Sequence, residues 1–134
     1  MSLDRERLGE LADALIPAES GMPSATEAGA LGPGLDAVLT ARPDLETPLA
    51  GLPAAAAGLD AAEAVQALPE RDPAGWGALT AAVTAAYYMN EDVRAKVGYA
   101  GQQAIPFDPD HEDYLEDGLL DSVQSRGPVY RPTP

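Results

Sequence analysis

Apolar residues recur with helical spacing at the start of the chain. Within residues 3–16 they fall at i, i+3, i+4 and i+7, at Leu8, Leu11, Ala12 and Leu15, and charged residues take the other faces. This pattern predicts an amphipathic helix that packs one face against a core. Pro17 follows directly and marks the end of the helix.

The middle of the chain carries the strongest helix-start signals. The segment Asp60-Ala61-Ala62-Glu63 predicts the start of a helix that runs to about Leu68. Asp72 and Pro73 combine an N-cap residue with proline at the first helical position. We expect the longest helix to begin there and to end near Met89.

Shorter elements are expected on both sides of these helices. Ser24 and Glu27 form a capping-box pattern, which predicts a short helix that Gly32-Pro33-Gly34 ends. Residues 52–59 are rich in Pro, Ala and Gly, and we expect no regular structure there. Further short helices are expected over 35–41, 44–51, 93–97 (closed by Gly98) and 112–125.

No segment alternates apolar and polar residues with the period of a strand. The expected fold class is therefore all-α: one small, irregular helical domain over 1–134, with a helical core over 1–98. Residues 99–134 are rich in Gly, Pro and Asp, which predicts a long extended or loop-rich C-terminal arm.

Composition makes this core thin and the surface acidic. Leu, Ile, Val and Phe together supply fewer than a fifth of the 134 residues, and the formal net charge is −14. Such a charge repels nucleic acid and anionic lipid and favours a basic protein partner. There is no cysteine, no apolar stretch long enough for membrane insertion, and no secretory leader pattern at the N-terminus, so we expect a cytoplasmic protein.

Catalytic and metal-binding patterns are weak. His111 is the only histidine, which excludes a histidine pair and a two-histidine metal site within one chain. Asp108, Asp110 and Glu112 alternate as in a calcium loop, but the glycine required at the sixth position is replaced by Asp113. We therefore expect no catalytic, cofactor-binding or metal-binding residues. A stand-alone interaction domain or calcium-responsive adaptor remains the alternative.

All seven aromatic residues lie beyond residue 75. Tyr87 and Tyr88 are adjacent on the predicted long helix, so they point about 100° apart and cannot both enter one core face. One of them is expected to meet a neighbouring segment or a partner, because tyrosine is favoured at protein interfaces. The other reading is that the aromatic residues compensate for an alanine-rich core.

Two regions of the chain resemble the small (third) subunit of gluconate 2-dehydrogenase and related flavin-dependent sugar dehydrogenases. The first is Leu11-Ala12-Asp13-Ala14-Leu15-Ile16-Pro17, continuing through Gly21-Met22-Pro23-Ser24-Ala25 to Ala28-Gly29; it is similar to the family's opening helix, Ile-Pro break and following turn. The second is Tyr87-Tyr88-Met89-Asn90 through Val97-Gly98-Tyr99-Ala100-Gly101, similar to a tyrosine-ended helix and a Gly-Tyr-x-Gly turn.

The resemblance implies a non-catalytic accessory subunit of an oxidoreductase complex. Its partner would be a large FAD-dependent subunit of the glucose–methanol–choline type, which oxidises a sugar, sugar acid or glycoside and carries the flavin and all catalytic residues. Exported members of the family share a leader that this sequence lacks, which favours a cytoplasmic complex. The residues expected to bind the partner are Tyr87, Tyr88, Tyr99, Phe107 and Tyr130, with Gly98 and Gly101 shaping the turn that presents them.

Overall fold

The computed structural model describes residues 3–104 and 118–129. Over these two ranges the chain forms helices joined by turns and contains no β-strand, only an isolated bridge between Glu19 and Met22. The predicted all-α class is thereby confirmed. The chain divides after Gly101 into two compact units, which are described separately.

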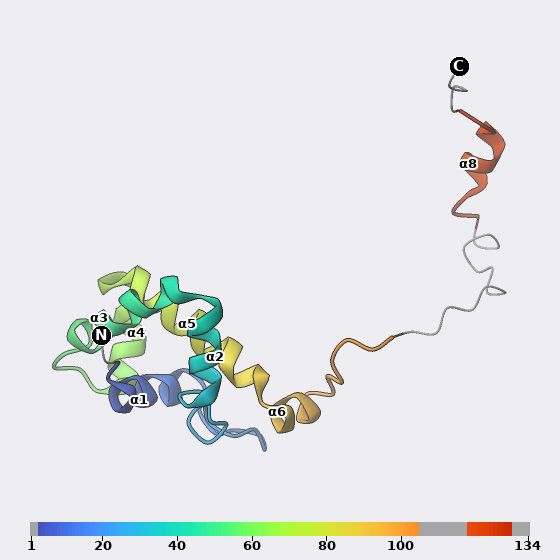
Figure 1. The fold of residues 1–134 in the computed structure, drawn as a ribbon. Helices are drawn as coiled ribbons and strands as arrows, with labels where there is room; N and C mark the ends of the chain where they lie inside the picture. The colour runs from blue at the N-terminus through green and yellow to red at the C-terminus, as the bar shows by residue number, and fades with distance from the viewer. Residues whose placement is uncertain (1–2, 105–117, 130–134) are drawn as a thin grey trace. The chain divides into compact units, whose positions relative to one another are not determined.

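The first unit contains a set of helices that surround one central helix (Figure 1). Its elements are α1 (Arg5–Leu15), α2 (Pro33–Ala41), the 3₁₀ turn η1 (Pro43–Leu45), α3 (Glu46–Ala55), α4 (Ala61–Arg71), α5 (Pro73–Met89) and α6 (Glu91–Lys96). The central helix is α5, since it packs against α2, α3, α4 and α6.

The first turn of α5 explains why the longest helix starts where it does. The Asp72 carboxylate accepts a hydrogen bond from the backbone N–H of Gly75 at 2.9 Å, and Pro73 occupies the first helical position. These contacts satisfy groups that a helix N-terminus otherwise leaves unpaired. The helix ends at Met89, as predicted, because Asn90 leaves the helical conformation and caps α6.

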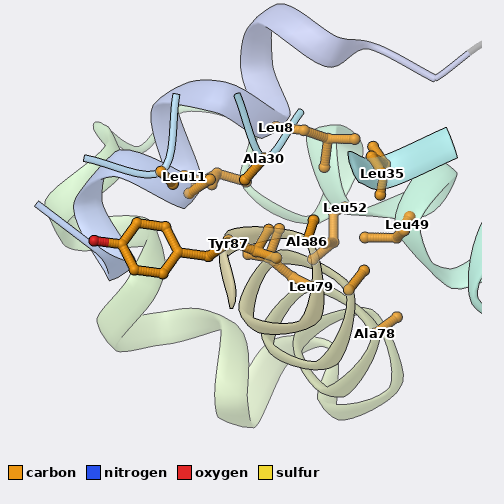
Figure 2. Close-up of a cluster of buried hydrophobic side chains, with 14 of the residues drawn as sticks. Leu8, Leu11, Ala30, Leu35, Leu49, Leu52, Ala78, Leu79, Ala86 and Tyr87 are labelled. Atoms are coloured by element: carbon orange, nitrogen blue, oxygen red, sulfur yellow. The ribbon is translucent and has the colours of Figure 1, made fainter. Parts of the chain in front are cut away.

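The core is built from leucines that converge on α5 (Figure 2). Leu8 and Leu11 come from α1. The other fully buried leucines come from α2, α3, α4 and α5, and they are Leu35, Leu49, Leu52, Leu68 and Leu79. Each fully buried leucine contributes about 1.5–3 kcal/mol by leaving water. Alanines fill the remaining contacts, and they let the helices approach closely; a Cβ on Gly34 would lie 3.2 Å from the Cβ of Ala86.

The partly buried side chain of Arg7 connects α1 to the segment between α3 and α4. The Arg7 guanidinium donates to the carbonyl oxygens of Leu59 at 2.7 Å and Ala56 at 3.3 Å, and it also pairs with Glu10 one turn further along α1. These carbonyls lie just after the end of α3, where helical acceptors lack partners within the helix. Arg7 therefore satisfies a helix end with a side chain 49 or more positions away in sequence.

Two sequence predictions in the first unit are wrong. The reciprocal hydrogen bonds of the capping box form, since the Ser24 N–H donates to Glu27 Oε2 at 2.8 Å and the Glu27 N–H donates to Ser24 Oγ at 3.3 Å. The following residues nevertheless form successive turns instead of a helix, and Gly29 has a left-handed φ of 73°. Pro33, expected to break a helix, instead begins α2 at its first position.

The segment expected to lack structure is also partly helical. α3 continues to Ala55 with Pro53 inside it, and only the residues after it form turns. Pro53 has no N–H to donate to the carbonyl of Leu49 one turn before it, so the last turn of α3 has one helical hydrogen bond fewer.

The second unit is described over Gln102–Ala104 and residues 118–129, where it contains the short helix α8 (Asp121–Arg126). Gly127 closes this helix with a left-handed φ of 68°. The predicted helix over 112–125 thus corresponds in its last part to α8, and residues 112–117 lie outside the described part of the chain. Leu119, Val123 and Val129 are exposed.

Candidate partner-binding surface

The predicted partner-binding residues that the structure describes lie at the C-terminal end of the first unit. They belong to the last turn of α5, to α6 and to the turn that follows. Asn90 joins the two helices, because its side-chain oxygen accepts hydrogen bonds from the N–H groups of Asp92 at 2.8 Å and Val93 at 3.1 Å. Val93 is fully buried and fixes α6 against the core.

Gly98 ends α6 in a Schellman motif. The Tyr99 N–H donates to the Arg94 carbonyl at 2.9 Å, and the Gly98 N–H donates to the Ala95 carbonyl at 3.1 Å. This pattern requires a left-handed residue, and Gly98 has a φ of 74°. Gly101 has a φ of 82°, so a second left-handed position follows within the same turn. Both glycines therefore shape the backbone around Tyr99.

Tyr87 faces the interior of the unit. It is 3% exposed, its ring ends the row of buried leucines in Figure 2, and its hydroxyl donates to the Pro23 carbonyl at 2.8 Å. Burial, with smaller contributions from the neighbouring Tyr88 and Glu27, raises the pKa of the Tyr87 hydroxyl above its ordinary value. Tyr87 is thus a core residue, and it does not offer the surface expected of a partner-binding side chain.

Tyr88 points outward. It is 48% exposed and meets the edge of the Tyr87 ring at a centroid distance of 5.4 Å and an interplanar angle of 87°. Three other large apolar side chains within residues 88–99 are about half exposed: Met89, Val97 and Tyr99, at 50%, 49% and 55%. We call Tyr88, Met89, Val97 and Tyr99 the α6 apolar surface, because they lie directly before and after that helix.

A hollow of about 490 Å³ lies beside Tyr99. Glu91, Arg94 and the Gly98–Ala100 backbone line it. Arg94 Nη2 is 3.8 Å from Glu91 Oε1, and its Nε is buried without a hydrogen-bond partner among the described residues. The hollow therefore combines an aromatic wall with a guanidinium that is only partly paired.

The side chains of Asn90 and Lys96 connect this region to the segment between α1 and α2. Asn90 Nδ2 donates to the Ala28 carbonyl at 3.0 Å, and Lys96 Nζ donates to the Gly21 carbonyl at 2.7 Å. With the Tyr87 hydroxyl on Pro23, three side chains, from α5, from α6 and from the residue between them, hold residues 21–28 in place. No local sequence pattern marks these residues, because each bond joins segments more than 60 positions apart.

Several predicted features lie outside the described residues. They are Phe107, Tyr130, His111 and the acidic run that contains Asp108, Asp110 and Glu112. Among residues 3–104 and 118–129, no three His, Cys, Asp or Glu side chains are grouped so that they could hold a metal ion. Within the same ranges, no helix combines the length and apolar character needed to cross a bilayer.

No protein-family model, curated protein or solved structure matches this chain. The similarity to the small subunit of the flavin-dependent sugar dehydrogenases therefore stays a prediction from the motifs around Ile16-Pro17 and Gly98-Tyr99.

Proposed function

We propose that this chain is a non-catalytic accessory subunit that binds and stabilises a large FAD-dependent sugar or glycoside oxidoreductase. The observation that carries the proposal is the α6 apolar surface, on which two tyrosines, a methionine and a valine are each about half exposed. Tyrosine and methionine are enriched in protein–protein interfaces, and single exposed apolar residues are common while groups of large ones are less so.

The outward side of α5 supports the same proposal. None of the seventeen residues of α5 is charged, although 22% of the whole chain is. The exposed positions Gly77, Ala81 and Thr84 lead along the helix towards Tyr88. A surface helix usually carries charged residues on its outward face, so a neutral face favours contact with another protein.

The thin core fits an obligate subunit. Alanine makes up much of the buried apolar set, and it removes less area from water than leucine or valine. A partner that binds only the folded chain stabilises it by mass action, and buried interface area then substitutes for core area. The identity of the partner comes from the family resemblance, which assigns the flavin and the catalytic residues to the large subunit.

Co-expression with a large FAD-dependent oxidoreductase subunit of the glucose–methanol–choline type tests the proposal. We expect a complex that copurifies with a flavin absorbance spectrum, and a lower yield of this chain when it is expressed alone. A stable monomer in high yield that leaves the flavoenzyme behind would contradict the proposal.

A pair of neighbouring tyrosines provides a matched control. Tyr88→Ala removes exposed surface, so we expect reduced recovery of the flavoenzyme and little change in the melting temperature of the free chain. Tyr87→Phe removes a buried hydroxyl, so we expect a lower melting temperature of the free chain. At temperatures below this melting point, recovery of the flavoenzyme should be unchanged. Equal recovery with Tyr88→Ala would argue against binding through this surface.

A further inference from the structure

Two adjoining hollows lie where the end of α5 meets the turn between α1 and α2. The first, of about 360 Å³, is mainly apolar and is lined by residues 28, 29, 33 and 34 together with Ala86 and Met89. The second, of about 550 Å³, is lined by residues 18–23 with Glu27, Asp92 and Lys96. Ala28 and Asn90 line both hollows, and the Asn90 side chain donates a hydrogen bond to the Ala28 carbonyl.

The walls of the second hollow are held in place by the chain's own hydrogen bonds. Glu19 and Met22 exchange two backbone hydrogen bonds, at 3.2 and 2.9 Å, across a turn whose central residues Ser20 and Gly21 have φ of 53° and 81°. Positive φ at both positions is typical of a tight type I′ turn. Lys96 Nζ then fixes this turn to α6 at the Gly21 carbonyl. A ligand would therefore meet a preformed surface and would lose little free energy in ordering it.

The second hollow carries an excess of negative charge. Three carboxylates line it, from Glu19, Glu27 and Asp92, against one ammonium group from Lys96. The Lys96 ammonium already donates to Gly21, and the structure places no ion pair on Glu19 or Asp92 within the described ranges. The net charge of −14 on the whole chain adds to the attraction for a cation.

The first hollow offers an apolar contact directly beside this charge. Met89 forms one wall and is 50% exposed, and its unbranched side chain can adapt to the shape of an apolar group. Gly34 and Ala86, which pack closely against each other, are also part of its lining. The apolar and the acidic hollow are neighbours, since Ala28 and Asn90 line both.

We propose that these two hollows together receive a protein segment in which an apolar side chain is flanked by lysine or arginine. The apolar side chain occupies the hollow beside Met89, and the cation occupies the hollow lined by Glu19 and Asp92. This inference rests on the proposed function, and it specifies the chemistry of the partner at this surface. A second copy is disfavoured as the occupant, because two chains of charge −14 repel each other.

Short peptides test this chemistry without the flavoenzyme. The probes are acetylated and amidated Gly-Arg-Leu-Arg-Gly, the same peptide with serine for leucine, and the same peptide with glutamate for both arginines. Titration into the full ¹⁵N-labelled chain at low ionic strength is followed by amide chemical shifts. We expect the Arg-Leu-Arg peptide to shift the amides of Ala28, Met89 and Asp92, the serine peptide to bind at least threefold more weakly, and the glutamate peptide to cause no shift.

Charge-matched variants locate the site. Glu19→Gln with Asp92→Asn should weaken the Arg-Leu-Arg peptide at least threefold, whereas Glu6→Gln with Glu70→Gln removes the same charge from exposed positions elsewhere and should leave affinity within twofold. Met89→Ser should weaken binding, and Val123→Thr, which alters a similarly exposed side chain of α8 that lines neither hollow, should not.

Three results would overturn the inference. They are the absence of any shift at millimolar peptide, equal shifts with all three peptides, and a dimer in light scattering that Met89→Ser dissociates, which would make a second copy the occupant. Copurification of the flavoenzyme with the Glu19→Gln, Asp92→Asn chain at wild-type yield would also place its contact elsewhere. That last result would leave the proposed function standing, so the two failures are distinguishable.

Discussion

Removal of the Tyr87 hydroxyl provides a quantitative test of the core. Tyr87→Phe keeps the ring that fills the end of the leucine cluster and deletes one hydrogen bond, the 2.8 Å contact to the Pro23 carbonyl. A typical intramolecular hydrogen bond contributes about 1 kcal/mol net to stability. The free energy of unfolding at pH 7 should therefore fall by about 1 kcal/mol, and the melting temperature by roughly 4 °C for a chain of this size.

The same substitution has a predicted pH dependence with a definite sign. Burial raises the pKa of Tyr87 in the folded chain above its value in the unfolded chain, which is about 10. The stabilising contribution is therefore complete below pH about 10 and is lost as the pH rises through the folded pKa. Above pH about 10 the wild type therefore loses stability relative to Tyr87→Phe, and the loss continues until the pH passes the folded pKa of Tyr87.

Urea denaturation followed by circular dichroism at pH 7, 9, 10 and 11 measures both effects. Comparison of wild type with variant at each pH removes the titration of other groups, which the two proteins share. Tyr88→Phe is the matched control, since its hydroxyl makes no hydrogen bond with the described residues and should change stability by less than about 0.5 kcal/mol. If Tyr87→Phe were as stable as wild type at pH 7, or followed the same pH profile, the assigned burial and hydrogen bond would be incorrect.

Two glycines of α5 and one helix cap provide further tests by thermal and urea denaturation. Gly75→Ala should cost about 1–2 kcal/mol, since its Cβ would displace the capping Asp72 carboxylate and lie 2.9 Å from Leu52 Cδ2. Gly77→Ala should instead gain about 0.5–1 kcal/mol, because nothing lies within 4 Å of its Cβ and alanine is the better helix former; loss of stability there would contradict the placement of that face in solvent. Asp60→Ala should cost about 1 kcal/mol through loss of the capping box of α4, and an unchanged urea midpoint would contradict that cap.

Helix starts could be predicted where the signal is local. The N-caps Asp60 and Asp72 act on N–H groups three residues away, so the sequence contains the whole interaction. The Ser24–Glu27 pattern also formed its hydrogen bonds, yet no helix followed, because left-handed Gly29 stops propagation before a second turn is complete. A capping box thus predicts a local hydrogen-bond pattern more reliably than it predicts a helix.

The helical spacing of Leu79, Ala86 and Tyr87 places them on one face of α5, and all three are buried, but this spacing does not by itself exclude Tyr87 from a partner interface. α5 has no charged residue, so no polar face marks its outward side and periodicity alone does not orient the helix. Tyr87 faces inward because its hydroxyl reaches Pro23, a contact across 64 positions. Met89, Asn90 and Lys96 were missed for the same reason, since their roles depend on which distant segment lies beside them.

The three side-chain bonds that hold residues 21–28 in place also have a consequence for the order of events during synthesis. Pro23 leaves the ribosome 64 residues before Tyr87, and Gly21 leaves 75 residues before Lys96. At a translation rate of roughly 5–20 residues per second, the residues that donate to these carbonyls are synthesised about 3–15 seconds after the carbonyls themselves. During that interval α1 can form, but the surface that later lies under α5 stays exposed to the ribosome's surroundings. The nascent N-terminal third of this chain is therefore the stage at which early binding by a partner or a chaperone would have the largest effect on yield.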